Sequence, residues 1–196
     1  MSLTSFIAAY VLVAMTPGPN MAVVAQASLR HGRRRALMAA AGVALGAAAL
    51  TVCVITAAVH VPRPSIDSRS FGALYGLLVI WMGVSCLGNR GNRPDRQSSR
   101  AGFCQAMIVA LLNPYTALLI LTYTSGAEPA QIRAAAPGLV LSVFLIAGCW
   151  LSCVALGLSS RLFTKANLGL RMGLVPVIGI LLIGLGTFSV LQALPV

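Results

Sequence analysis

The sequence contains very little charge, and almost none of it is acidic. Only 9% of the 196 residues are charged, and just three of them are Asp or Glu. A water-soluble domain carries roughly a quarter of its residues as charged side chains, so this composition excludes an ordinary soluble fold. Hydrophobic residues make up 58% of the chain, which is typical of a protein that lies in a lipid bilayer.

The positive balance of the chain, +11 at neutral pH, has two interpretations. A nucleic-acid-binding protein gathers Lys and Arg along one groove or helix face, with aromatic side chains between them. Here the basic residues flank long apolar stretches, as they do in the cytoplasmic loops of membrane proteins. We therefore attribute the charge to membrane topology and expect no nucleic-acid partner.

The sequence also lacks the residue groupings that metal binding and catalysis require. The five cysteines fall in apolar stretches, and none belongs to a CxxC pair or a Cys/His cluster. We predict that they are small, buried apolar side chains, with no metal site. No apolar stretch holds a Ser/His, paired-Asp or HExxH arrangement, so the sequence argues against an enzyme, and no cofactor is predicted.

Six uncharged stretches are long enough to cross a bilayer, which takes about 20 helical residues. They run approximately over residues 3–29, 36–59, 71–88, 103–124, 136–158 and 174–194. No segment between them could hold a soluble domain. The sequence predicts an all-α membrane protein in which residues 1–196 form a single domain of six transmembrane helices.

Basic residues concentrate in the first, third and fifth connections between these spans. They are Arg30, Arg33, Arg34 and Arg35, then Arg90, Arg93, Arg96 and Arg100, then Arg161, Lys165 and Arg171. Because Lys and Arg mark the cytoplasmic side of short loops, both termini are predicted to face the periplasm or the cell exterior.

Several glycines have the spacing of helix-packing motifs. Gly42 and Gly46 form a GxxxG pair in the second span, and Gly179, Gly184 and Gly186 lie in the sixth. Small residues let helix backbones approach each other where lipid provides no hydrophobic driving force. We predict that these glycines pack against neighbouring helices, and that small residues in the second, fifth and sixth spans permit a homodimer.

Two of the six spans are interrupted by proline. The first contains Thr16-Pro17-Gly18-Pro19-Asn20 and the fourth contains Asn113-Pro114-Tyr115. A proline inside a helix donates no N–H and clashes with the carbonyl four residues back, so the C=O groups of Val13, Met15 and Ala110 are predicted to lose their helical partners. Such groups are tolerated in a bilayer only inside protein or beside a water-filled cavity, where each neighbouring Asn offers a donor and an acceptor.

The two breaks fall in the first helix of each half of the chain. A division between the third and fourth spans gives one repeat at about 1–90, a cytoplasmic loop at about 89–101 and a second repeat at about 102–196. Because each repeat holds three helices, the second must be inverted in the membrane, as in many secondary transporters. Simple packing kinks would also explain the prolines, but the matched, Asn-flanked positions favour a binding site.

We therefore predict a solute site formed by residues at and near the two breaks. Half-helix N-termini would hold a carboxylate and unwound carbonyl groups an ammonium group, which suits a zwitterionic amino acid. The residues predicted to bind the solute are Thr16, Pro17, Gly18, Pro19, Asn20, Gln105, Asn113, Pro114 and Tyr115.

Motifs along the whole chain resemble those of the LysE/RhtB family of amino-acid exporters. They are Thr16–Asn20, Ser28–Arg33 and Gly42–Gly46 in the first half, Gly102–Pro114 in the second, and Tyr75–Gly83, which is similar to the family's third helix. The resemblance implies six helices and the efflux of amino acids or their derivatives across the bacterial inner membrane, driven by the proton or ion gradient.

Two positions depart from the family pattern. Ala47 stands where the family commonly has an Asp, and Tyr115 stands where it commonly has a Lys. None of the three acidic residues lies in a predicted span, so the spans hold no carboxylate of the kind that usually carries a proton. The alternatives left open are a transporter of a different small solute or lipid, and a membrane homologue that does not transport.

Overall fold

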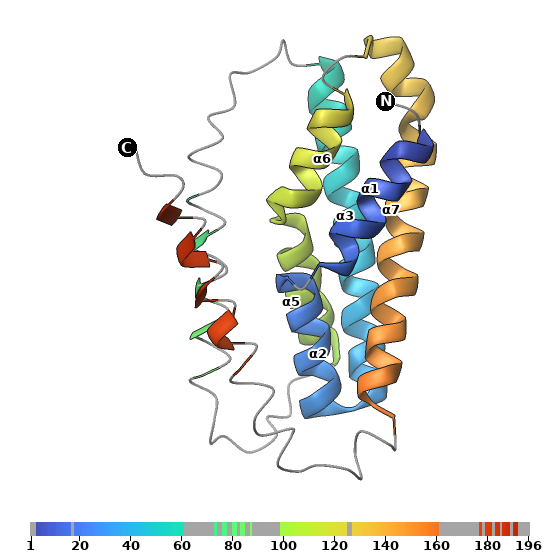
Figure 1. Cartoon of the computed structure of the whole chain (residues 1–196). Coiled ribbons are helices and arrows are strands. Elements are labelled where there is room, and N and C mark those ends of the chain that lie inside the picture. Colours follow the sequence, from blue (N-terminus) through green and yellow to red (C-terminus); the bar gives the residue numbers. More distant parts are fainter. Residues whose placement is uncertain are drawn as a thin grey trace.

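The computed structural model describes residues 3–16, 18–60, 99–124 and 127–160, with scattered positions between 73 and 87 and between 177 and 191. The elements of the continuous ranges are α1 (Leu3–Met15), α2 (Pro19–His31), α3 (Arg33–His60), α5 (Ser99–Leu111), α6 (Pro114–Thr124) and α7 (Pro129–Leu158). They lie side by side in an elongated bundle (Figure 1). The prediction of an all-helical protein is confirmed for this part of the chain.

Four of the six predicted spans have described counterparts. Helices α3 and α7 are each long and apolar enough to cross a bilayer alone, and the pairs α1–α2 and α5–α6 pass the same test as two bent spans. The predicted spans at 71–88 and 174–194 fall largely on residues outside the described part. The count of six helices and the inverted repeat therefore stay predictions.

Helix α7 begins before residues 136–158, the uncharged stretch predicted to be the fifth span. Pro129 occupies the first turn, and the backbone N–H of Glu128 donates to Gln131 Oε1 over 3.3 Å in a capping box. This cap starts the helix about two turns before Ala136, and the helix continues through Pro137. The predicted span is thus the apolar part of a longer helix.

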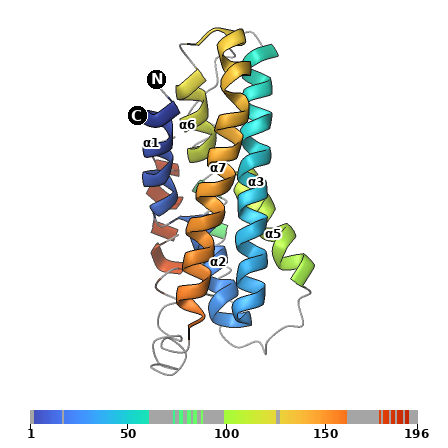
Figure 2. The same ribbon diagram turned by 90° about the vertical axis from the view of Figure 1, so that its right-hand side faces the viewer.

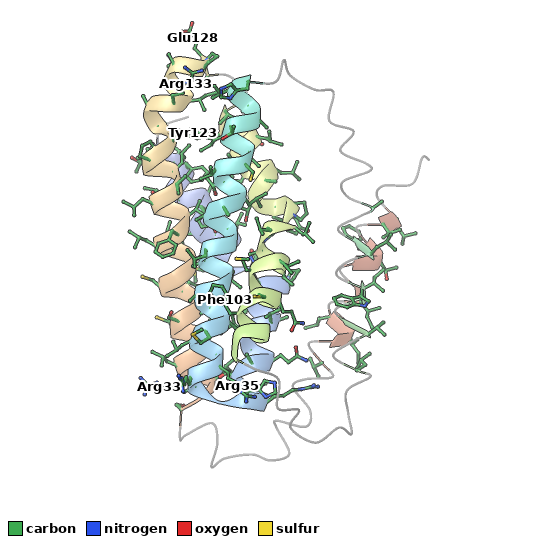
Figure 3. All side chains as sticks on the ribbon, turned by 180° about the vertical axis from the view of Figure 1, so that it is seen from behind. Arg33, Arg35, Phe103, Tyr123, Glu128 and Arg133 are labelled. Atoms are coloured by element: carbon green, nitrogen blue, oxygen red, sulfur yellow. The ribbon has the colours of Figure 1, made fainter. Side chains whose placement is uncertain are left out.

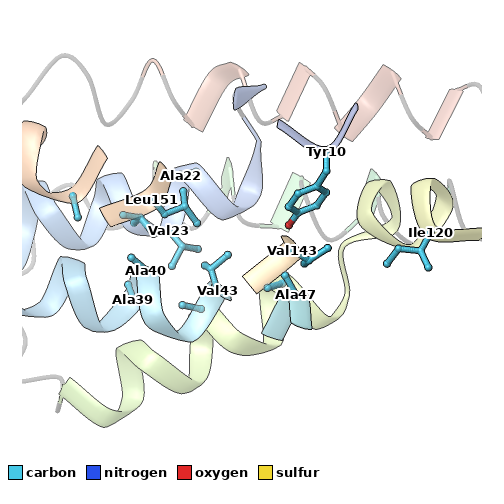
Figure 4. Packing of buried hydrophobic residues seen from close by; sticks show 14 of the residues in the cluster. Tyr10, Ala22, Val23, Ala39, Ala40, Val43, Ala47, Ile120, Val143 and Leu151 are labelled. Atoms are coloured by element: carbon cyan, nitrogen blue, oxygen red, sulfur yellow. The ribbon is translucent and has the colours of Figure 1, made fainter. Parts of the chain in front are cut away.

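Helix α3 lies at the centre of the bundle and contacts α2, α5, α6 and α7. Its buried face consists mainly of alanine, glycine and valine, whose small side chains let the neighbours approach closely. Figure 4 shows Ala39, Ala40 and Val43 of this face beside Ala22 and Val23 of α2. The part of the core that surrounds α3 is therefore built mainly from small side chains.

The GxxxG pair of α3 lies directly against α5. A Cβ atom on Gly42 would collide with the carbonyl oxygen of Phe103, and one on Gly46 with that of Met107. The predicted close packing at these two glycines is confirmed. Because the residue numbers rise on both helices from the first contact to the second, α3 and α5 run in the same direction.

Glycines also meet between described positions of the third and sixth predicted spans. Gly76 lies against Gly186, and Gly83 lies against Gly179. Since one number rises while the other falls, these segments run antiparallel. The packing prediction is confirmed for Gly179 and Gly186, whereas at Gly184 an added Cβ would meet no described atom within 4 Å.

Charged side chains separate to the two ends of the bundle. Arg33 and Arg35 lie at one end, whereas Glu128 and Arg133 lie at the other (Figure 3). The first end also contains the start of α5 and the end of α7 (Figure 2), from which the other two predicted basic connections lead. The position of these helix ends agrees with the predicted topology; the side of the membrane on which they lie stays a prediction.

The prediction that the cysteines are buried is wrong for the four that the structure describes. Cys53, Cys104, Cys149 and Cys153 are all exposed on the surface of the bundle, and Cys86 lies outside the described residues. In a bilayer the outer face of a bundle meets lipid, which is as apolar as the protein interior. An apolar sequence context therefore does not tell an inward side chain from an outward one.

Candidate solute site

The first break ends α1 at Met15, and the axes of α1 and α2 differ by 48°. The N–H of Thr16 lies 3.1 Å from the carbonyl oxygen of Leu12 and 3.2 Å from that of Val13. The Val13 carbonyl, predicted to lose its partner to Pro17, thus accepts a shorter-range bond of the 3₁₀ type. That part of the prediction is wrong. Pro17 itself lies outside the described residues.

Helix α2 restarts with a first turn that no side chain caps. Gly18 is the extended N-cap and has no side chain to offer, and Pro19 follows at the first position. The N–H of Ala22 donates to the Gly18 carbonyl over 2.9 Å. The N–H groups of Asn20 and Met21 precede that first helical bond. They therefore belong to the first-turn donors that have no acceptor within the helix.

Asn20 carries an unsatisfied polar atom at this break. Its Oδ1 is buried, and no described group lies within hydrogen-bond distance of it. Most buried polar side-chain atoms in folded proteins have a partner, and each exception needs an explanation. An acceptor left in this state costs about 1–3 kcal/mol.

The second break, between α5 and α6, has an angle of 40° and a different hydrogen-bond pattern. The N–H of Asn113 donates to the Ala110 carbonyl over 3.2 Å, so the prediction that this carbonyl loses its partner is wrong. The side-chain Oδ1 of Asn113 accepts the N–H of Tyr115 over 3.1 Å. Asn113 is therefore the N-cap of α6, with Pro114 at the first helical position.

The two broken helices contact each other on both sides of their breaks. Helix α1 packs against α6, and α2 packs against α5. The hydroxyls of Tyr10 and Thr116 are hydrogen-bonded, and the rings of Phe6 and Tyr123 meet edge to face with centroids 5.3 Å apart. These pairs show that α1 and α6 run antiparallel, which places the two breaks side by side near the middle of the bundle (Figure 1).

The residues predicted to bind the solute differ in their exposure. Pro19 and Pro114 are buried; Gly18, Asn20 and Asn113 are half-buried; Thr16, Gln105 and Tyr115 are exposed. Tyr115 keeps 52% of its surface, and Thr16 Oγ1 donates to the Leu12 carbonyl over 2.9 Å. Of the four polar side chains at the break residues themselves, only that of Asn20 is left with a buried atom that the described structure does not satisfy.

Comparison with protein families identifies the chain. The model of the family described as LysE type translocator matches residues 11–193. The chain belongs to the LysE type translocator family. No curated protein and no solved structure matches it. The translocator is thus a multi-pass membrane protein of a transporter family, not of an enzyme family, and its family points to amino acids or related solutes.

Ala47 of the translocator, at the position where the LysE/RhtB pattern commonly has an Asp, lies in the protein core. The residue is fully buried on α3, and its carbonyl accepts the Thr51 hydroxyl over 2.7 Å. In Figure 4 the Tyr10 hydroxyl points towards the side of the core where Ala47 and Val143 lie. A carboxylate at this position would therefore be enclosed by protein between α1, α3 and α7.

Three polar side chains of the translocator were missed by the sequence analysis. Tyr10 and Thr116 are buried and bonded to each other beside the breaks; a polar residue within two turns of a helix break is the signal that could have found them. Trp150 has a buried Nε1 with no partner in the described structure. It lies in the unbroken helix α7, and no sequence signal marks it.

Proposed function

We propose that this translocator exports amino acids or closely related derivatives across the bacterial inner membrane, through a solute site at the two breaks. The observation that carries the proposal is the unsatisfied Oδ1 of Asn20 at the point where one interrupted helix contacts another. A solute N–H placed there would satisfy the buried acceptor and recover the free energy that its burial costs.

The start of α2 offers a complementary place for the solute carboxylate. The N–H groups of Asn20 and Met21 have no side-chain cap competing for them, because Gly18 has no side chain. Helix N-termini carry a partial positive charge and bind anions through such free N–H groups. A zwitterionic amino acid would place its carboxylate at this turn and its ammonium group at Asn20 Oδ1.

The transport cycle that we propose uses two inverted repeats of three helices, with both termini outside the cytoplasm. The contact of the two broken spans across antiparallel α1 and α6 supports this arrangement, since inverted-repeat transporters bind their solute where such interrupted helices meet. Export against a concentration gradient needs an energy source, and we assign that role to the proton or ion gradient.

The experiment is an efflux assay in cells that are loaded with a mixture of dipeptides and hydrolyse them to free amino acids. We expect cells that express the translocator to accumulate one or a few amino acids outside, and a protonophore to abolish the difference. Asn20→Ala should lose this accumulation. Thr187→Val is the matched control, because it removes a polar group from an exposed side chain and should retain efflux.

Two controls decide what a negative result means. The variants must reach the membrane in equal amounts, measured by immunoblot of the membrane fraction. Equal external concentrations of every amino acid with and without the translocator would contradict the proposal and leave a different small solute, a lipid or a non-transporting homologue.

A further inference from the structure

Charged side chains are missing from every predicted span of the chain. Of the three acidic residues, Glu128 belongs to the capping box of α7, and Asp67 and Asp95 fall between predicted spans. All 14 Lys and Arg residues also lie outside the spans. A solute that reached the level of the breaks with a charged side chain would therefore meet no opposite charge there.

Two unsatisfied atoms of opposite kinds remain buried in the described structure. They are Asn20 Oδ1, which can only accept a hydrogen bond, and Trp150 Nε1, which can only donate one. Trp150 is partly buried and packs against the core cluster of the bundle. Together the two atoms would satisfy a polar solute that carries both a donor and an acceptor.

The packing of α2 on α7 puts these atoms at a similar depth. The buried hydroxyl of Ser28 donates to the Ala155 carbonyl over 3.1 Å, and both helices run towards the same end of the bundle (Figure 1). From that bond, Asn20 lies eight residues back along α2 and Trp150 five residues back along α7. At 1.5 Å per residue, the levels of the two residues along their helices differ by about 5 Å.

We propose, on the basis of the proposed export function, that the solute has an uncharged side chain, and that Asn20 and Trp150 select it. Asn20 Oδ1 accepts a hydrogen bond from an N–H or O–H of the solute, and Trp150 Nε1 donates one to a solute oxygen. Lysine and arginine are rejected because no carboxylate balances a second positive charge, and glutamate and aspartate because no Lys or Arg balances a second negative one. Burying an unpaired charge is far more costly than burying a zwitterion whose two charges are both bound.

The test uses the purified full-length chain in proteoliposomes loaded with an equimolar mixture of labelled threonine, leucine, lysine and glutamate. We expect the wild type to release threonine or leucine at least about tenfold faster than lysine and glutamate. Release of lysine or glutamate at the same rate as the neutral amino acids would overturn the inference while leaving the proposed function in place. Release of none of the four would overturn both.

Asn20→Asp tests the role of the acceptor with almost no change in shape. The added carboxylate would supply a negative charge that offsets the extra positive charge of lysine, so the rate ratio of lysine to threonine should rise at least about tenfold. Asn20→Ser also alters this side chain but adds no charge, so in this variant the rate ratio of lysine to threonine should not rise. An unchanged ratio in a reconstituted Asn20→Asp protein would refute the assignment of selectivity to this residue.

Trp150→Phe removes the indole N–H and keeps an aromatic ring in the core. If Trp150 binds the solute, the KM for the neutral amino acid should rise several-fold while the maximal rate changes little. A purely structural role would instead lower the amount of active protein, which appears as a lower maximal rate at unchanged KM. That second outcome, or no change in either constant, would remove Trp150 from the site; it would also fit buried water as the partner of its Nε1.

Discussion

The two helix breaks contain the same pair of residue types, Asn and Pro, in opposite orders. In the second break Asn113 precedes Pro114, so its side chain reaches the N–H of Tyr115 and caps α6. In the first break Asn20 follows Pro19 and lies inside the first turn, where its Oδ1 finds no partner among the described residues. A shift of two positions relative to proline therefore separates an asparagine that caps its helix from one whose side-chain oxygen stays unsatisfied in the described structure.

Helices α2 and α5, which each form one half of a broken span, are also held differently. Helix α5 is fixed by backbone contact, because Gly42 and Gly46 of α3 lie against its carbonyl groups. Helix α2 is held to α7 by a side-chain bond, from Ser28 to the Ala155 carbonyl. The two spans are thus held by different kinds of contact, and the predicted effects of substitutions at these contacts follow that difference.

The largest effect is expected at the backbone contact that holds α5. Gly46→Leu would force a side chain into the Met107 carbonyl and the Ala110 methyl group, and overpacking of this kind costs about 3 kcal/mol or more when the backbone cannot move. We expect little folded protein, measured by fluorescence-detected size exclusion in detergent. Gly157→Leu is the matched control, because an added Cβ there meets no described atom within 4 Å.

The two asparagines should respond differently to alanine. Asn113→Ala removes the cap of α6 and should lower the unfolding free energy by about 1 kcal/mol. Asn20→Ala removes an unsatisfied buried acceptor and should leave the unfolding free energy unchanged or raise it by about 1 kcal/mol. Thermal unfolding in detergent measures both, and equal losses in the two variants would show that Asn20 has a structural partner after all.

The hydrogen bond between Tyr10 of α1 and Thr116 of α6 should have an intermediate effect on stability. Tyr10→Phe keeps the ring against Phe6 but leaves the Thr116 hydroxyl without its partner, which costs about 1 kcal/mol. Thr116→Val should cost a similar amount, and the double variant should cost less than the sum of the two. Additive losses in this double-mutant cycle would indicate that the two hydroxyls do not interact.

The smallest effect is expected at the bond that holds α2. Ser28→Ala removes the hydroxyl, but the Ala155 carbonyl keeps its bond from the Ser159 N–H at 3.1 Å. The loss in unfolding free energy should therefore stay near 0.5–1 kcal/mol, again by thermal unfolding. Ser28→Thr, which retains a hydroxyl, serves as the control, and a loss as large as that of Gly46→Leu would mean that α2 and α5 are held equally tightly.

Residue chemistry explains which features were predictable. Proline lacks an N–H whatever surrounds it, so Pro19 and Pro114 locate the two breaks from the sequence alone. The state of the neighbouring groups was not predictable, because Val13 and Ala110 regain partners through local backbone geometry. The outward cysteines and the unpaired Trp150 depend on which face of a helix meets lipid or core, and an almost uniformly apolar helix such as α7 carries no periodicity that tells one face from the other.

The junction between α2 and α3 has a mechanical consequence for the site. Gly32 alone joins the two helices, with a φ of 80° that favours glycine, so the far end of α2 is fixed to the start of α3. A tilt of α2 about Gly32 would displace its opposite end the most, and Asn20 lies at that end. With a lever arm of about 18 Å, a tilt of about 10° would carry Asn20 sideways by about 3 Å, roughly the length of one hydrogen bond.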